Sequence, residues 1–274
     1  MGREVSALTS NQVSRRNIRL LILLSAAIYF SSYLTRLNYS AVLVEMIASE
    51  HYTRSAASAA LTGLFITYGA GQLLSGYLGD RTKPQLLIFA GLLVSAAMNL
   101  LIPLCPGTGL MTAVWCVNGL AQAMMWPPLV RIRSELLSEA DYKTATVRVS
   151  WGSSLATILI YLTAPLFIQW GGWRLIFFVC AVFALVMAFV WIFCFRKLES
   201  KMRANRLVPV AHSAVNGKGT GIPSTLWGVL ALIMLAIVMQ GLLRDGITTW
   251  MPSYISETFD LGSGISILPS VALP

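Results

Sequence analysis

One stretch decides the fold class: Tyr29-Phe-Ser-Ser-Tyr-Leu-Thr-Arg-Leu-Asn-Tyr39 places an arginine, Arg36, inside an apolar run from Leu20 to about Ala48. On a helix that rises about 1.5 Å per residue, Arg36 lies about 24 Å from Leu20 and about 18 Å from Ala48. Its side chain cannot easily reach either headgroup layer from that depth. Because a charge there costs at least about 2.5 kcal/mol, such an arginine normally faces a water-filled cavity or a partner. The stretch predicts a membrane-spanning helix with a functional arginine.

A second arginine repeats this arrangement late in the chain. Arg244 stands 18 residues after Leu226, which opens another long apolar run, whereas Arg36 stands 16 residues after Leu20. The two arginines are therefore expected at about the same depth from the same membrane face.

Paired guanidinium groups suit an anion. Each one offers a planar, permanently charged fork that binds phosphate or carboxylate through two hydrogen bonds, and a low-dielectric cavity strengthens that pairing. The alternative is that both arginines are structural and are satisfied by backbone carbonyls, by Asp245 or by Glu45.

The composition excludes a water-soluble core. Hydrophobic residues make up 56% of the 274 residues, charged residues make up 11%, and the mean hydropathy is +0.71, as is typical of a helical protein that crosses the bilayer repeatedly. The net charge of +9 follows the placement of basic residues between apolar runs, so a lipid bilayer is the expected partner and nucleic acid is not. The four cysteines and two histidines are scattered, so no disulfide framework, metal site or cofactor is expected.

Apolar runs of spanning length predict an all-α, polytopic membrane helix bundle. We expect bends where the fourth run contains Pro127-Pro128 and the fifth contains Pro165. Seven runs are expected to span, and residues 264–274 open an eighth; the seven cover residues 20–48, 56–78, 84–104, 109–130, 144–168, 173–195 and 226–254.

Basic residues set the expected orientation. Of the 20 lysines and arginines, 16 fall on the side of the N-terminus, Arg131 and Arg133 among them, whereas only Arg54 and Arg174 fall on the other side. Since cytoplasmic loops carry the excess of positive charge, we expect a multi-pass protein of the cell membrane with a cytoplasmic N-terminus.

One long polar connection divides the chain. The matching depths of Arg36 and Arg244 on either side of it suggest a repeated six-helix unit whose second copy is incomplete. The missing C-terminal half is then a partner supplied from elsewhere, or the chain is a truncated product or fragment. The expected organisation is a cytoplasmic tail at 1–18, a six-helix half at 19–199, a cytoplasmic linker at 200–223, and the first span with the start of a second span at 224–274.

A short charged turn follows the second apolar run, at Gly76-Tyr-Leu-Gly-Asp-Arg-Thr-Lys83. It reads either as a topogenic charge cluster with a helix cap, or as a conformational latch built from Asp80, Arg81 and Arg131. Together with Gly172-Trp-Arg174, which opens the sixth run, this turn resembles the major facilitator superfamily. That resemblance implies two six-helix halves that rock around a central site.

A narrower resemblance is carried by the segment Gly119-Leu-Ala-Gln-Ala-Met-Met-Trp-Pro-Pro-Leu-Val-Arg131, by Ser150-Trp151 and by the Leu-x-Arg segments of the first and seventh runs. These are similar to the organophosphate:phosphate antiporter family, which exchanges glycerol 3-phosphate or hexose 6-phosphate for phosphate. The resemblance implies that Arg36 and Arg244 grip the phosphate. It places the other substrate-binding positions at Tyr29, Tyr33, Tyr68, Gln122, Trp126 and Trp151.

The chain also departs from that family. Leu37, Gln72 and Leu155 stand where the family carries a lysine, a lysine and a histidine. The expected pocket has therefore lost positive charge. Gln72 is still expected to be a substrate-binding residue. Asp245 next to Arg244 weakens the field further. A less charged anion, or a different coupling, becomes credible.

These observations favour a secondary active transporter that moves a small organic anion by alternating access, with exchange for phosphate as the implied coupling. Two alternatives stay open: ion-coupled transport of a carboxylate or another small solute, and a non-transporting sensor of sugar phosphate. The chain shows no Ser-His-Asp set, paired catalytic carboxylates or metal cluster, so an enzyme is not expected.

Overall fold

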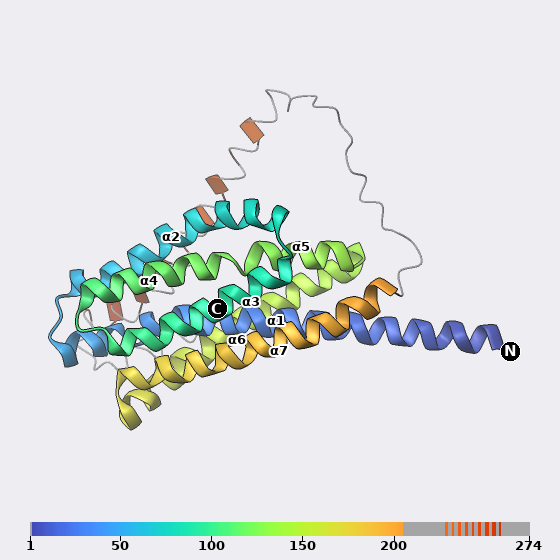
Figure 1. The fold of residues 1–274 in the computed structure, drawn as a ribbon. Coiled ribbons are helices and arrows are strands. Elements are labelled where there is room, and N and C mark those ends of the chain that lie inside the picture. Colours follow the sequence, from blue (N-terminus) through green and yellow to red (C-terminus); the bar gives the residue numbers. More distant parts are fainter. Residues whose placement is uncertain are drawn as a thin grey trace.

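The computed structural model describes residues 2–204 and separate residues between 228 and 258, with the side chains of residues 2–14, 80, 203 and 204 excepted. Within these residues every regular element is a helix, which confirms the predicted all-α membrane bundle (Figure 1). The elements are α1 (Gly2–Glu50), α2 (Arg54–Arg81), α3 (Pro84–Leu101), the short 3-10 helix η1 (Ile102–Leu104), α4 (Thr108–Ala123), α5 (Trp126–Leu136), α6 (Glu139–Gly171) and α7 (Trp173–Ala204).

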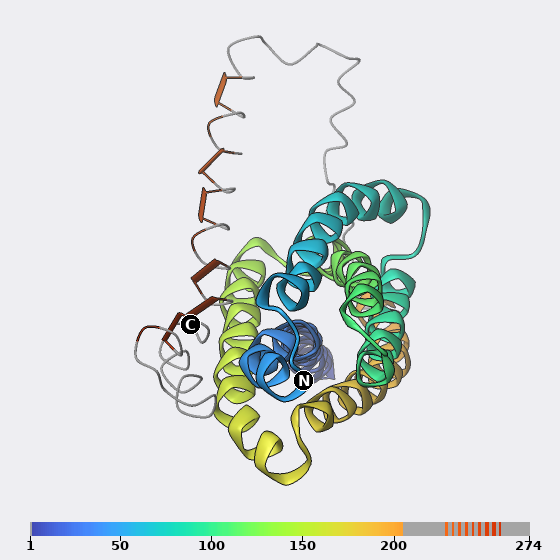
Figure 2. The same cartoon turned by 90° about the vertical axis from the view of Figure 1, so that its left-hand side faces the viewer.

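The first helix forms the axis of the bundle. Seen end-on, α1 is enclosed by a ring of α2, α3, α4, α6 and α7 (Figure 2). Every residue from 31 to 40 is buried, Arg36 included. Most of the segment that decided the fold class therefore lies in the longest run of buried residues, 31–43, in the described part of the chain.

Two prolines break the predicted fourth span. The expected run at 109–130 is divided into α4 and α5 by a turn at Met124 and Met125, and the Trp-Pro-Pro element opens α5. A proline lacks the backbone N–H, so it fits the first turn of a helix and interrupts a helix interior. The bend predicted at Pro127-Pro128 is confirmed as a break, whereas α6 continues as one helix through Pro165.

Four of the described helical segments are long and apolar enough to cross a membrane by length and composition: Arg15–Glu50, Pro84–Leu104, Glu139–Gly171 and Trp173–Met202. The sequence predicts six spans in the same region. The α4–α5 pair is not among the four because the break leaves each helix too short to cross a membrane. The helix α2 falls short because small and polar residues such as Gly69, Gly71 and Gln72 lower its hydropathy.

Small residues let neighbouring helices approach closely. A Cβ atom on Gly119 of α4 would lie 2.2 Å from Thr67 Oγ1 and 2.5 Å from the Leu64 carbonyl oxygen of α2. A Cβ atom on Gly152 of α6 would lie 2.6 Å from the Ala26 carbonyl oxygen of α1. Such contacts replace the hydrophobic effect as a source of packing energy between helices in lipid.

An ion pair closes the end of the bundle that the sequence predicts to be external. Arg174 Nη1, at the start of α7, lies 2.8 Å from Glu50 Oε1, at the end of α1. The indole nitrogen of Trp173 donates to the same oxygen at 3.2 Å, and Arg174 Nε donates to the Pro103 carbonyl at 3.3 Å. The non-cytoplasmic charge expected at Arg174 thus fixes three helix ends to one another.

Candidate functional site

The predicted arginine of the first span lies in the middle of the bundle. Arg36 is only 7% exposed, and its guanidinium carbon lies 4.4 Å from the ring centre of Tyr33 and 5.5 Å from that of Tyr68. Tyr33 precedes Arg36 by one helical turn, and Tyr68 comes from α2. A desolvated guanidinium gains about 2 kcal/mol from such a ring face, so the two tyrosines stabilise the buried charge.

A line of aromatic rings leads away from Arg36 along α1. The ring of Tyr33 lies 5.0 Å from that of Tyr29, and Tyr29 lies 4.7 Å from Trp126 at the start of α5. The guanidinium of Arg133 lies 5.1 Å from the Trp126 ring. Tyr33, Tyr29 and Trp126, here called the aromatic chain, therefore join two buried arginines at different depths.

Arg133 is buried more deeply than the sequence suggests. Its side chain is 0% exposed and lies between the rings of Trp126 and Tyr142, the latter at 5.6 Å. Its Nε donates to the Leu129 carbonyl at 3.3 Å, but neither Nη atom has a hydrogen-bond acceptor among the described residues. The sequence counts Arg133 with the surface charges of the cytoplasmic side; the structure places it inside the bundle.

Helix geometry gives the reason for this difference. Arg131 and Arg133 are two positions apart, so they point about 200° away from each other around α5. When Arg131 faces the neighbouring end of α2, Arg133 must face the interior. That alternation was the signal in the sequence that could have found Arg133.

A buried polar network crosses three helices beside the arginine. The Gln122 carbonyl oxygen accepts a hydrogen bond from Ser32 Oγ at 2.5 Å, and its amide nitrogen donates to Thr35 Oγ1 at 2.9 Å and to Ser95 Oγ at 3.0 Å. Both ends of this amide are therefore bonded to protein atoms. The resemblance gave Gln122 a role in substrate binding, and the structure places it as the link between α1, α3 and α4.

Three asparagines extend that network. Asn99 and Asn118 both donate to the Thr35 carbonyl at 3.1 Å, and Asn38 donates to Asn99 Oδ1 at 2.6 Å. Ser95 Oγ donates to Asn118 Oδ1 at 2.7 Å. Sequence reasoning missed these residues, although amides inside apolar runs are costly without partners and so point to such a network.

The remaining predicted binding residues are an exposed tryptophan on α6, a glutamine one helical turn after Tyr68 on α2, and an arginine outside the described residues. Trp151 is 68% exposed on α6, and Gln72 is half-buried on α2. Arg244 lies outside the described residues. Within the described part, the structure groups Arg36 with Tyr33 and Tyr68. The aromatic chain extends this group to Tyr29 and Trp126.

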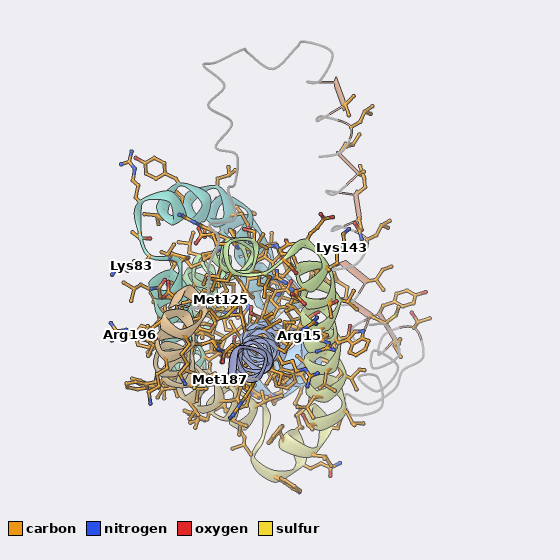
Figure 3. The ribbon with its side chains drawn as sticks, turned by 90° about the vertical axis from the view of Figure 1, so that its right-hand side faces the viewer. Arg15, Lys83, Met125, Lys143, Met187 and Arg196 are labelled. Carbon is orange, nitrogen blue, oxygen red and sulfur yellow. The ribbon has the colours of Figure 1, made fainter. Side chains whose placement is uncertain are left out.

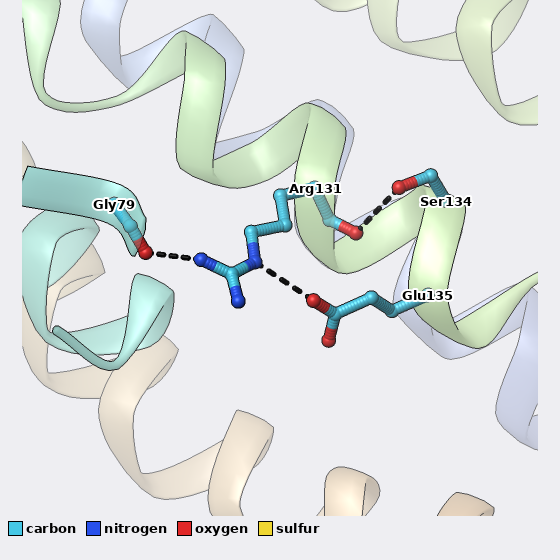
Figure 4. Close-up of polar contacts among 4 residues, drawn as sticks. All are labelled: Gly79, Arg131, Ser134 and Glu135. Atoms are coloured by element: carbon cyan, nitrogen blue, oxygen red, sulfur yellow. Dashed lines mark hydrogen bonds and ion pairs between the residues drawn. The ribbon is translucent and has the colours of Figure 1, made fainter. Parts of the chain in front are cut away.

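The predicted latch region contains a contact between α5 and the end of α2. Arg131 Nη1 donates to the Gly79 carbonyl, and Arg131 Nε lies 2.7 Å from Glu135 Oε1 (Figure 4). Arg81 is exposed, with its guanidinium over the Tyr77 ring at 4.2 Å. The Asp80 side chain lies outside the description, so its part in a latch stays a prediction. Arg131 binds a helix end, where backbone carbonyls favour a cation.

The sequence model of the Major Facilitator Superfamily matches residues 25–273, which is nearly the whole chain. The chain belongs to the major facilitator superfamily. A solved bacterial homolog of the human lysosomal transporter Spinster, in an inward-facing and occupied conformation, shares this fold with a TM-score of 0.63 at 14% identity, over 92% of this chain and 57% of that one.

Curated superfamily relatives confirm the narrower resemblance to organophosphate:phosphate antiporters. The membrane sensor protein UhpC of Salmonella typhimurium is 26% identical over 89% of this chain and 57% of its own length. The glycerol-3-phosphate transporter of Bacillus subtilis is 25% identical over 84% of the chain and 55% of its own. A probable hexose phosphate transport protein of Chlamydia muridarum is 25% identical over 60% of this chain and 36% of its own length. The chain thus spans about a third to just over half of the length of these superfamily members.

Proposed function

We propose that this protein binds a small organic anion, of the organophosphate class or close to it, and moves it across the cell membrane by alternating access. One observation carries the proposal: a guanidinium is held at the centre of a membrane-spanning helix, 7% exposed, between tyrosines of α1 and α2. Ionisable groups at such depth are costly and are normally kept for function. The relatives named for hexose phosphate and glycerol 3-phosphate support an organophosphate as the anion.

Arg36 and Arg244 together form the proposed binding site. Two guanidinium forks hold a phosphate through charge-assisted hydrogen bonds, which are about twice as strong as neutral ones. Leu37, Gln72 and Leu155 leave the pocket with less positive charge than the antiporter pattern. We therefore favour a substrate with a single phosphate or a related acid.

The aromatic chain supplies a route between two depths. Tyr29 and Trp126 connect the surroundings of Arg36 to Arg133, near the end of the bundle predicted to be cytoplasmic. In a state that opens this end, Arg133 offers the anion a second positive contact. The contact between Arg131 and the end of α2 lies at the same end and is proposed to open and close with it.

Alternating access needs a second half around the substrate. The span at 226–254, with Arg244, is proposed to begin that half. Anion binding neutralises both arginines, so it lowers the energy of a closed, occluded state through which the halves exchange. The N-terminus is proposed to be cytoplasmic, in keeping with the basic residues.

A sensor of sugar phosphate is the second candidate, because the membrane sensor protein UhpC matches 89% of this chain. Such a protein would keep the arginine site and lose turnover. Counterflow separates the two functions: vesicles with the purified protein, both halves present, are loaded with unlabelled glycerol 3-phosphate or glucose 6-phosphate, and entry of labelled compound is followed. A transporter accumulates label and the Arg36→Ala variant does not. Binding with no accumulation supports the sensor, and neither binding nor accumulation contradicts both.

A further inference from the structure

A groove lies between α1 and α7, away from the arginine site, at the end of the bundle that carries Arg15. It has a volume of about 480 Å³. Its wall is apolar, with Leu20 and Leu23 on α1 and Met187 and Val190 on α7. Figure 3 views this end of the bundle and shows Met187 beside α1.

One end of the groove is polar and, among the described residues, is lined by an asparagine and two lysines. Asn17 is 6% exposed, and its Nδ2 has no hydrogen-bond partner among the described residues. Lys197 and Lys201, one helical turn apart on α7, are exposed and line the same end. The nearest acid in sequence, Glu199, instead accepts from Gln85 of α3 and lines a different cleft. The groove therefore offers two positive charges and an unused amide donor to an anion.

We propose that this groove binds an anionic glycerophospholipid from the adjacent leaflet, with its phosphate at Asn17, Lys197 and Lys201 and an acyl chain along the apolar wall. The dimensions support a lipid: Met187 and Lys197 are ten residues apart, or about 15 Å along α7, which equals half of the hydrocarbon thickness of about 30 Å. Basic pockets between helices at the cytoplasmic side are the type of site that holds lipid headgroups. A soluble phosphate would leave the apolar wall unused.

Lipid retention by the purified protein tests this site. Native mass spectrometry, with phosphatidylglycerol and phosphatidylcholine added in equal amounts, measures which lipid stays bound. At about fivefold for each basic residue near a headgroup, Lys197→Gln together with Lys201→Gln should weaken phosphatidylglycerol binding about 30-fold. Arg196→Gln is the matched control. This substitution removes one positive charge at a similar depth, next to Lys197 in the chain, but Arg196 does not line the groove.

Two further variants separate the parts of the site. Asn17→Leu should weaken phosphatidylglycerol binding without loss of thermal stability, because it removes a buried amide whose nitrogen is unbonded. Val190→Trp should fill the wall and exclude the acyl chain while both lysines remain.

Four results overturn the proposal. Equal retention of the two lipids shows that charge does not select the occupant. An equal loss in Arg196→Gln shows a general field effect, and glycerol 3-phosphate binding with the same lysine dependence shows a soluble ligand. A protein dimer that Val190→Trp disrupts shows that a second copy occupies the groove. The first, second and fourth results do not bear on the Arg36 site. In the third, Arg36→Ala tells the two sites apart, because glycerol 3-phosphate binding that depends on the lysines and survives Arg36→Ala counts against the Arg36 site as well.

Discussion

Replacing Arg133 by methionine is predicted to make the protein more stable. The side chain is 0% exposed, and both Nη atoms lack an acceptor among the described residues. Its two ring contacts, at 5.1 and 5.6 Å, are longer than the 4.4 Å contact between Arg36 and Tyr33 and contribute about 1 kcal/mol each. The Nε hydrogen bond to Leu129 contributes about 1 kcal/mol. Removing a guanidinium from water costs several kcal/mol, and apolar replacement of buried charges has stabilised other proteins by about 1 to 4 kcal/mol.

A net gain of about 1 to 2 kcal/mol is therefore expected, because methionine keeps the packing of the stem and removes the charge. At about 2 to 4 °C for each kcal/mol, Tm should rise by about 2 to 8 °C. Thermal unfolding in one detergent measures this change. Lys143→Met is the control, because Lys143 is 74% exposed in a pair with Glu139 and should shift stability by less than about 0.5 kcal/mol.

The same variant links stability to function. If Arg133 is kept for the anion, Arg133→Met should lose most of its counterflow activity while it becomes more heat-resistant. A fall in Tm of several degrees refutes the reasoning, because it shows that the ring contacts outweigh desolvation and that the arginine is structural. Full counterflow activity in a stabilised variant refutes the role of Arg133 on the anion route.

Other variants test the packing, the polar network and the latch region. Gly119→Ala should cost more than about 2 kcal/mol of unfolding free energy, because its Cβ atom clashes with α2. Gly109→Ala in the same helix meets open space and should gain up to about 1 kcal/mol from helix propensity. Equal Tm values for the two variants contradict the close approach of α4 and α2. Gln122→Leu should lower the free energy of unfolding by about 2 kcal/mol, at about 0.6 kcal/mol for each of three lost hydrogen bonds, and should keep anion affinity within about threefold of the wild type. An affinity loss as large as that of Arg36→Ala makes Gln122 a binding residue instead. Arg131→Met should keep anion binding and slow counterflow about tenfold or more, and an unchanged rate removes the latch role.

The sequence was sufficient for features that depend on transfer energy and local chemistry. The apolar runs predicted the helices. The Trp-Pro-Pro element predicted a bend, and the chain turns just before it, at Met124 and Met125. The depth of Arg36 in its run predicted that it lies inside the bundle. Each of these follows from one stretch of chain and from general costs, such as that of a charge in lipid or of a proline in a helix.

Features that depend on which helices become neighbours were not predictable. Gln122 joins the network because Ser32, Thr35 and Ser95 come from two other helices. Arg133 is buried because α6 places Tyr142 against it. No single stretch of the sequence records such neighbours. The two-residue spacing of Arg131 and Arg133 indicates that one of them turns inward, but not which one.

Equilibrium binding of anions to the purified protein tests the central claim most directly. Glycerol 3-phosphate, glucose 6-phosphate, inorganic phosphate, a phosphonate and a carboxylate are titrated against the wild type, Arg36→Ala, Arg244→Ala and the control Arg174→Ala, whose ion pair lies at the far end of α1. The account predicts that a phosphorylated compound binds to the wild type and the control. Each pocket variant should lose about tenfold to 100-fold in affinity, as expected for a charged hydrogen-bonding group worth about 1.5 to 3 kcal/mol. Binding that survives both pocket substitutions, or a wild type that binds none of these anions, would contradict it.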